Sequence, residues 1–180
     1  EFRDDLFGHK ATSDFWIAMR AWQFAQNNQF RQEMCRKAGI HAMTARQVGP
    51  LLEQFIRIAE NEGLTVKREP APTDAVEKCV LIGFSDRTAR RLDAGTLRCE
   101  LVHGRRANLA RESVVQQSPL LAAAEIREVE GADKTMTTVL SLATAIKLEW
   151  LRELFPQDLQ AKSRVYYDGM ARRVLAEEQV

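Results

Sequence analysis

Apolar residues in the first third of the chain recur at helical spacing. Ser13 is the expected N-cap of a helix that begins at Asp14, because its hydroxyl can accept a hydrogen bond from a first-turn N–H. The apolar positions that follow repeat every three or four residues and lie on one side of this helix: Phe15, Ala18, Met19, Trp22 and Ala25. The pattern therefore predicts an amphipathic helix that packs through this face.

Two more helices are expected before residue 66. One covers Phe30–Lys37 and ends at Gly39. Thr44 with Gln47 three residues later forms a capping box for a longer helix, and Pro50 in its second turn either starts the regular helix or bends it. The apolar stripe of this helix comprises Val48, Leu51, Leu52, Phe55, Ile58 and Ala59.

A linker is expected at residues 67–73, where two prolines interrupt a stretch without large apolar residues. The predicted organisation is a helical segment over residues 1–66, this linker, and a second domain over residues 74–180. Asp74 followed by Glu77 indicates a short helix that opens the second domain and runs to Phe84. Its inward positions are expected to be Val76, Cys79 and Val80.

After Phe84 the hydrophobic period changes from about 3.6 to 2, which is typical of half-buried strands. Residues 103–106 are expected to form a turn, and residues 122–129 are a further strand candidate. Two runs alternate apolar with polar positions. The first has Leu97, Cys99 and Leu101 inward, and the second has Met136, Thr138, Leu140 and Leu142.

The last part of the chain predicts a two-turn helix over residues 148–155 that Pro156 ends. Asp168-Gly169 follows and is a strong hairpin signal between two strand-like runs. About five short strands with one helix before the last pair suggest a small, largely antiparallel barrel of the OB type. The predicted fold class is α+β: an N-terminal helical segment followed by an OB-like barrel with inserted helices.

Composition narrows the class of protein. The 180 residues are 45% hydrophobic and 28% charged, which excludes a disordered chain, collagen and a coiled coil. No run of about 18 uncharged apolar residues is present, so no membrane partner is expected. The three cysteines have no paired spacing and are expected to be buried thiols in the cytoplasm. The chain starts at Glu1 without a signal peptide, and we expect it to be a fragment of a longer protein.

The motifs for nucleotide binding are absent from the sequence. A P-loop needs Gly directly before Lys-Ser/Thr, and the two candidates here are Asp133-Lys134-Thr135 and Ala161-Lys162-Ser163. No Gly-x-Gly-x-x-Gly motif occurs either. The chain by itself is therefore expected to be neither an ATPase nor the holder of a cofactor.

Metal binding and thiol catalysis are also not expected. His9, His41 and His103 are isolated from other ligand residues. Cys35 lies six residues before His41, which can be drawn as a thiol–imidazole pair, but no third orienting group accompanies them. We expect no catalytic residue and no metal ligand.

The charge distribution points to nucleic acid more clearly than the net charge of +1. Residues 86–111 hold seven arginines and three acids, whereas residues 112–133 hold one arginine and five acids. Arginine presents a planar fork of donors that matches phosphate, so the first stretch is a candidate nucleic-acid surface. The alternative is a solvated strand face whose arginines pair with the acidic stretch that follows.

Several segments, taken in order, resemble DEAH-box RNA helicases. The helical part resembles the end of the ratchet domain in the segments Ser13-Asp14, Ala21-Trp22, Cys35-Arg36-Lys37-Ala38-Gly39-Ile40 and Ala45-Arg46-Gln47-Val48. Three later segments are similar to the OB-fold region of bacterial HrpB-type helicases: residues 83–91, residues 148–156, and Tyr167-Asp168-Gly169 with Arg172-Arg173-Val174. Ser85 departs from the proline that is usual in that family.

This resemblance implies an accessory module of an ATP-dependent 3′-to-5′ RNA helicase. Such modules cap the motor core and line the exit channel for single-stranded nucleic acid. The expected partners are single-stranded RNA or DNA and the motor domains of the same full-length chain, where ATP and Mg²⁺ would bind. The alternative is a protein-interaction module that docks on the motor core or an activator protein without touching RNA.

The arginine-rich stretch supplies the candidate site residues. Phosphate contacts are expected from Arg87, Arg90, Arg91, Arg105 and Arg106, with Arg98 and Arg111 as second choices. His103 can stack on a base, although an ordinary turn histidine is the favoured interpretation. The resemblance implies that the loop with Gly104 varies within the family.

Overall fold

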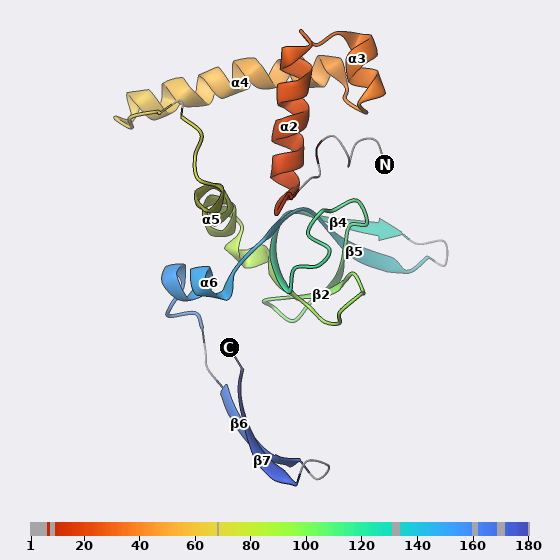
Figure 1. Ribbon diagram of the computed structural model, residues 1–180, viewed down its shortest axis with the longest axis vertical. Coiled ribbons are helices and arrows are strands. Elements are labelled where there is room, and N and C mark those ends of the chain that lie inside the picture. The colour runs from red at the N-terminus through yellow and green to blue at the C-terminus, as the bar shows by residue number, and fades with distance from the viewer. Residues whose placement is uncertain are drawn as a thin grey trace. The chain divides into compact units, whose positions relative to one another are not determined.

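The computed structural model describes residues 7, 10–67, 69–130, 134–159, 162–168 and 172–179, and its fold class is α+β, as predicted (Figure 1). The contacts divide the chain into residues 1–146 and residues 147–180. Each unit is described by itself below. No helix among the described residues is long and apolar enough to cross a membrane.

Among the described residues the α-helices before the first strand are α2 (Asp14–Asn27), α3 (Gln32–Lys37), α4 (Ala42–Asn61) and α5 (Thr73–Gly83), followed by the short 3-10 helix η1 (Ser85–Arg87). Helix α2 begins as predicted, with the Ser13 hydroxyl accepting a hydrogen bond from the Phe15 N–H. Helix α4 begins earlier than the capping box suggests, because the His41 ring nitrogen accepts from the Thr44 N–H at 3.3 Å. Pro50 lies inside α4.

The predicted apolar stripe of α4 is not buried. Its exposed side chains range from 42% exposure at Val48 to 68% at Phe55 and include Leu51, Leu52 and Ile58. The buried residue of α4 is Ala45, near the start of the helix, where it joins Ala25 and Cys35 in a small cluster. Met19, another predicted inward residue, is 51% exposed. Sequence periodicity identifies an apolar face but cannot show whether another element covers it.

Five strands close a barrel in the order β1-β2-β3-β5-β4, in which β4 pairs back with β1. The strands are β1 (Thr88–Arg91), β2 (Arg98–Leu101), β3 (Arg106–Leu109), β4 (Leu120–Glu130) and β5 (Met136–Ala145). Four of its strand pairs are antiparallel, as expected for a largely antiparallel barrel, whereas β3 and β5 pair in parallel. The sequence pattern gives strands but not their pairing, so this neighbour could not be predicted.

The barrel core contains the expected inward residues of β2, Cys99 and Leu101, both nearly fully buried. In β5 the prediction fails at Leu142, which is 41% exposed. The backbone of Leu142 has φ of 50°, so the strict alternation of the strand breaks there and Ala143 is buried instead. Met136 at the start of β5 is also exposed.

Helix α2 is joined to the barrel through its first residue. One Asp14 carboxylate oxygen accepts from the Val114 N–H at 2.9 Å and the Ser113 hydroxyl at 3.1 Å. The other oxygen accepts from the Ala143 N–H in β5 at 2.8 Å. These bonds satisfy barrel backbone groups with a side chain from the helical segment.

Two neighbouring contacts strengthen this joint. The Ser13 and Thr144 hydroxyls lie 2.7 Å apart in a buried hydrogen bond. Helix α5 is held through buried Glu77, whose carboxylate accepts from the Thr12 hydroxyl and the Trp16 indole N–H. The buried face of α5 thus holds Glu77 and Leu81, whereas Cys79, predicted to point inward, is exposed.

The second unit contains α6 (Leu148–Leu154) and a hairpin of β6 (Lys162–Asp168) and β7 (Arg173–Gln179). The predicted helix and hairpin are both present, although Gly169 lies outside the described residues. The hairpin is a separate two-stranded sheet and not the last pair of the barrel, which corrects the prediction. The contacts divide the chain after Ile146 and not at residues 67–73, and a separate domain over residues 1–66 stays a prediction.

Replacing Asp14 tests the joint between α2 and the barrel. Asp14→Ala leaves the Val114 and Ala143 N–H groups without their acceptor, so we expect a loss of about 3 kcal/mol in the free energy of unfolding. Urea denaturation followed by circular dichroism measures this loss. The control is Asp74→Ala, an exposed acid in the first turn of α5, which should cost less than about 1 kcal/mol. Equal losses in both variants would contradict a joint at Asp14.

Candidate nucleic-acid interface

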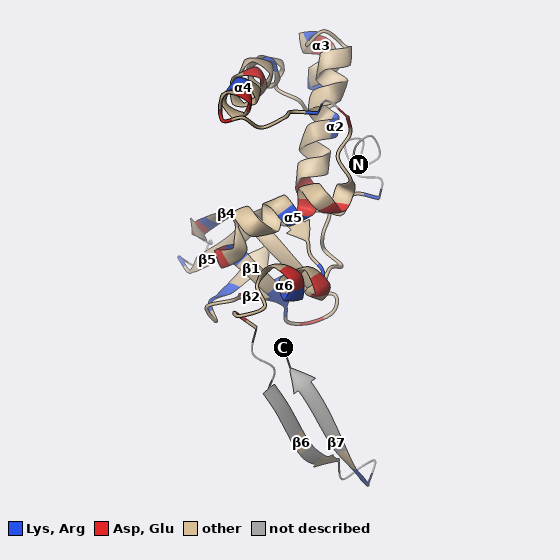
Figure 2. Ribbon diagram, turned by 90° about the vertical axis from the view of Figure 1, so that its left-hand side faces the viewer, with Lys and Arg blue, Asp and Glu red and all other residues tan. Residues whose placement is uncertain are grey.

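The outward face of β1, β2 and β3 gathers three of the seven candidate arginines. Arg90 lies opposite Glu100 in β2, and Glu100 lies opposite Arg106 in β3. Arg98 lies opposite Asn108 in the same pair of strands. These side chains share one face because alternate residues of a strand point the same way. Figure 2 shows that the barrel carries residues of both signs.

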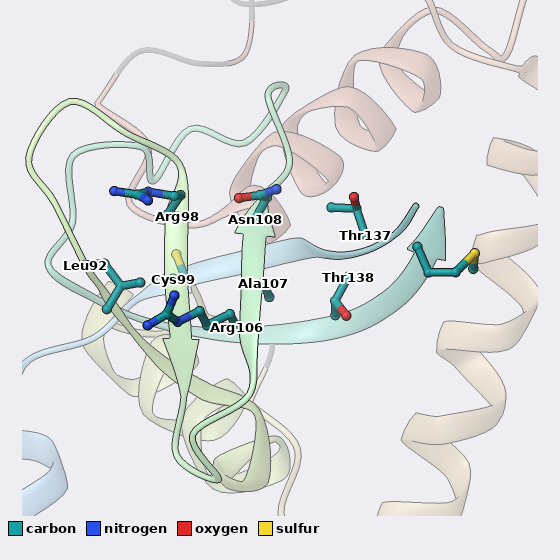
Figure 3. A pocket seen from close by; sticks show the side chains of 9 residues that line it. Leu92, Arg98, Cys99, Arg106, Ala107, Asn108, Thr137 and Thr138 are labelled. Carbon is teal, nitrogen blue, oxygen red and sulfur yellow. The ribbon is translucent and has the colours of Figure 1, made fainter. Parts of the chain in front are cut away.

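A groove of about 230 Å³, here called the barrel groove, opens beside β2 and β3 (Figure 3). It is lined by Leu92, Arg98, Cys99, Arg106, Ala107, Asn108, Met136, Thr137 and Thr138. The groove lies where β3 and β5 are not paired, since their pairing is confined to Asn108 with Val139 and Leu109 with Leu140. The start of β5 therefore forms one wall, and the two strands with their outward arginines form the other.

The groove arginines differ in how they are neutralised. Arg106 is exposed, and no carboxylate of the described residues pairs with it. Arg98 pairs with Asp93, and both side chains are about half exposed or more. Next to the groove, Arg90 donates two hydrogen bonds to Glu100, at 2.6 and 2.9 Å. Exposed pairs of this kind contribute at most about 1 kcal/mol, so a phosphate can replace the carboxylate.

Two of the first-choice arginines support the barrel itself. Arg91 donates to the backbone carbonyls of Thr96 at 2.7 Å and of Val115 and Ser118 at 3.1 Å. Arg87 donates to the Ala124 carbonyl at 2.6 Å. Their guanidinium groups therefore hold loops and strands together. Nothing in the sequence distinguishes them from Arg90, because all but one of the carbonyls that they bind lie 24 to 37 residues away in the chain.

The remaining candidates lie outside the groove. Arg105, in the turn before β3, pairs with Glu128, so for this residue the alternative of pairing with the acidic stretch is the observed arrangement. Arg111 is exposed in the loop that follows β3. His103 is exposed in the turn and does not line the groove. The charge run thus contains binding candidates, structural arginines and surface ion pairs.

The groove also holds polar residues that the sequence analysis did not select. Asn108, Thr137 and Thr138 line it and offer amide and hydroxyl groups for hydrogen bonds. Asn108 was detectable in principle, because it follows Arg106 at strand spacing and so shares its face. The threonines were not, since only the barrel closure brings β5 beside β3. Residues 88–109 contain no Phe, Tyr or Trp that could stack on a base.

The three free cysteines differ in exposure: Cys35 and Cys99 are buried, whereas Cys79 is exposed. In the Cys35–His41 pair considered in the sequence analysis, the Cys35 sulfur is fully buried and therefore not accessible to a substrate. The Nδ1 of His41 is hydrogen-bonded to Thr44. Burial raises the pKa of the Cys99 thiol, although the nearby Arg91 guanidinium acts in the opposite direction. Among the described residues, no group of three His, Cys, Asp or Glu side chains is placed to hold a metal ion.

Comparison with known proteins gives matches only among solved structures. No protein-family model and no curated protein matches the chain. A crystal structure of the DExH-box NTPase HrpB from E. coli aligns with a TM-score of 0.46 and 18% identity, over 94% of this chain and 20% of that one. A crystal structure of the Escherichia coli DEAH/RHA helicase HrpB aligns with a TM-score of 0.43 and 18% identity, over 95% and 20%.

Both structures are of HrpB, which gives its name to the type of helicase that the sequence resembles. The chain spans about a fifth of their length. With TM-scores below 0.5, these matches do not decide the fold or the function of this chain, which rest on its own residues.

Arg91 and Arg90 should respond differently to truncation. Arg91→Ala removes the donor to three backbone carbonyls, so we expect the free energy of unfolding to fall by about 3 kcal/mol. Arg90→Ala is the matched control from the same strand, and loss of its exposed ion pair should cost less than about 1 kcal/mol. Urea denaturation measures both losses. A small cost at Arg91 would show that its guanidinium does not support the barrel.

The thiols should react at very different rates. At pH 8 we expect Cys79 to react rapidly with a disulfide reagent, because it is exposed. Cys35 and Cys99 should react at least about tenfold more slowly until the protein unfolds; both are buried, and the raised pKa of Cys99 lowers its thiolate fraction at this pH. Absorbance of the released thiolate follows the reaction. Cys79→Ser should remove the fast phase, and two fast thiols in the native protein would disprove the assignment.

Proposed function

We propose that the barrel groove binds the phosphate backbone of single-stranded RNA or DNA, and that the chain is an accessory module of an ATP-dependent RNA helicase of the HrpB type. The observation that supports this most is the position of Arg98 and Arg106. They line a groove on the outward face of β2 and β3, between the loop after β1 and the start of β5.

This position matters because of how OB-type barrels bind oligonucleotides. In the OB-fold, a five-stranded barrel, the face of strands 2 and 3 and the loops between strands 1 and 2 and between strands 4 and 5 form the binding site. In this chain Leu92 comes from the loop after β1, and Met136 is the first residue after the loop between β4 and β5. Together with the closed strand order, this arrangement favours an OB-like barrel.

The lining predicts the kind of contact. Guanidinium groups bind phosphate oxygens, and the Asn108 amide with the two threonine hydroxyls can bond to phosphate or sugar oxygens. Such contacts carry no sequence information, so binding should be independent of sequence and sensitive to salt. Without an aromatic stacking platform in β1–β3, affinity should be modest.

The helicase context comes from the resemblance of the ordered sequence segments. In such an enzyme the chain would sit beside motor domains that bind ATP and Mg²⁺ and would help to guide the single strand. Its own residues supply the contact surface and not the hydrolysis, since no nucleotide-binding motif is present in the sequence.

A second candidate function is docking of this module on the motor core or an activator protein. The exposed apolar stripe of α4 favours it, because five large apolar side chains on one helix face are seldom left in water. Ion pairs such as Arg105 with Glu128 also make part of the barrel surface neutral. The two functions can coexist, since α4 and the barrel groove share no residue.

Charge reversal in the groove tests the proposed function. Arg98→Glu combined with Arg106→Glu should weaken binding of a labelled single-stranded RNA at least about tenfold. It should also lower the slope of log affinity against log salt by roughly 1.4, because each phosphate contact on a single strand contributes about 0.7. Fluorescence anisotropy at low and near-physiological salt measures both. Arg91 is unsuitable for this test because its replacement is expected to destabilise the barrel.

The matched control is Arg57→Glu with Arg152→Glu, which reverses two exposed charges outside the groove. This variant should keep most of the affinity and a slope nearer to that of the wild type. Equal losses of RNA affinity in both double variants would mean that binding depends on the net charge of the protein and not on the groove. No binding by the wild type at low salt would instead favour the docking function.

A further inference from the structure

The helical segment contains a second basic cavity, here called the helical pocket, at the junction of α3 and α4. Its volume is about 360 Å³, within the range of pockets that hold small ligands. Its walls include Phe30, Arg36, Ile40, His41, Met43 and Arg46. It shares no lining residue with the barrel groove.

The charge around this pocket is less compensated than the charge on the barrel. Residues 28–52 contain four basic residues and one acid, Glu33. Glu33 pairs with Lys37 at 3.0 Å. Arg36 and Arg46 are exposed, and no carboxylate of the described residues pairs with either of them. Two guanidinium groups at the rim of one cavity favour an anionic ligand.

The aromatic wall of the pocket is held in place before a ligand arrives. Gln29 and Phe30 both have φ of 55°, a conformation that costs a non-glycine residue roughly 1 kcal/mol or more. The turn is held by the Phe30 N–H, which donates to the Ala25 carbonyl at 2.8 Å, and by packing of Phe30 against the buried cluster that contains Cys35. The Arg46 guanidinium lies over the Phe30 ring, 5.8 Å from its centre.

Helix α4 is fixed beside this wall as well. The Trp22 indole N–H donates to the Ala45 carbonyl at 2.9 Å, so the first turn of α4 is tied to α2. Arg46 follows Ala45 directly, and its position over Phe30 is therefore set by two separate contacts. A pocket built in this way loses little conformational entropy when it binds a ligand.

These groups match the parts of a nucleotide. An arginine fork binds phosphate oxygens, a guanidinium plane can stack on a base, and the apolar side chains of Ile40 and Met43 can contact a base or a sugar. We infer that the helical pocket binds one nucleoside monophosphate unit, with phosphate at Arg36 and Arg46. The unit is either a free nucleotide or one residue of a single-stranded nucleic acid. The second of these sources rests on the proposed function.

Nuclear magnetic resonance on the ¹⁵N-labelled chain tests this inference. Adenosine 5′-monophosphate should shift the amide signals of residues 29–46 saturably, with at least tenfold weaker binding in Arg36→Ala/Arg46→Ala. Adenosine and inorganic phosphate should each bind more weakly than the nucleotide, since each lacks half of the contacts. Arg57→Ala/Lys67→Ala, which removes two exposed charges outside the pocket, should bind as the wild type does.

Three results would overturn the inference. They are no shifts in residues 29–46, shifts of equal strength with inorganic phosphate alone, or tighter binding of a phosphoserine peptide than of the nucleotide. A single-stranded RNA titration separates this from the proposed function. If RNA shifts the amide signals of the barrel groove but not those of residues 29–46, a single strand is not the source of the nucleotide unit, and the proposed function stands. If the nucleotide binds at residues 29–46 and RNA does not bind at all, the pocket is supported and the proposed function is contradicted.

Discussion

The three hydrogen bonds that Asp14 accepts are the constraint on which the first unit depends. The carboxylate lies at the start of α2, yet its donors are Ala143 in β5 and Ser113 and Val114 in the loop between β3 and β4. Removing them would leave barrel N–H groups without acceptors in a part-buried place, which is costly. These bonds connect the helical segment to the barrel within residues 1–146, and the Ser13–Thr144 bond and the Glu77 contacts add to the same joint.

This joint connects the two candidate binding regions, the barrel groove and the helical pocket, through helix α2. The barrel groove depends on β2, β3 and β5, and Asp14 bonds directly to β5. The helical pocket depends on α3 and α4, which pack on α2 through Cys35, Ala45 and Ala25. Both sites thus trace back to α2, one through its first residue and the other through its last turns.

The candidate site was predictable in location but not in detail. The arginine-rich stretch 86–111 includes the strands that line the barrel groove, and the period of 2 places Arg98 and Arg106 on one side of their strands. Yet Arg90, Arg91 and Arg105 are indistinguishable in sequence, and their roles differ because their partners are distant. Arg91 supports backbone carbonyls, whereas Arg90 and Arg105 pair with glutamates.

Local signals in the sequence determined the helices, the strands and most of their ends, because caps, prolines and periodicity act within a few residues. The Ser13 cap and the inward Cys99 and Leu101 are of this kind. Only the tertiary structure decided the parallel pairing of β3 with β5, the exposure of Leu142 and the α4 stripe, and the separate hairpin. These features depend on which distant segments pack together. The free energy of that packing arises from pairs of segments, so no single segment of the sequence determines it.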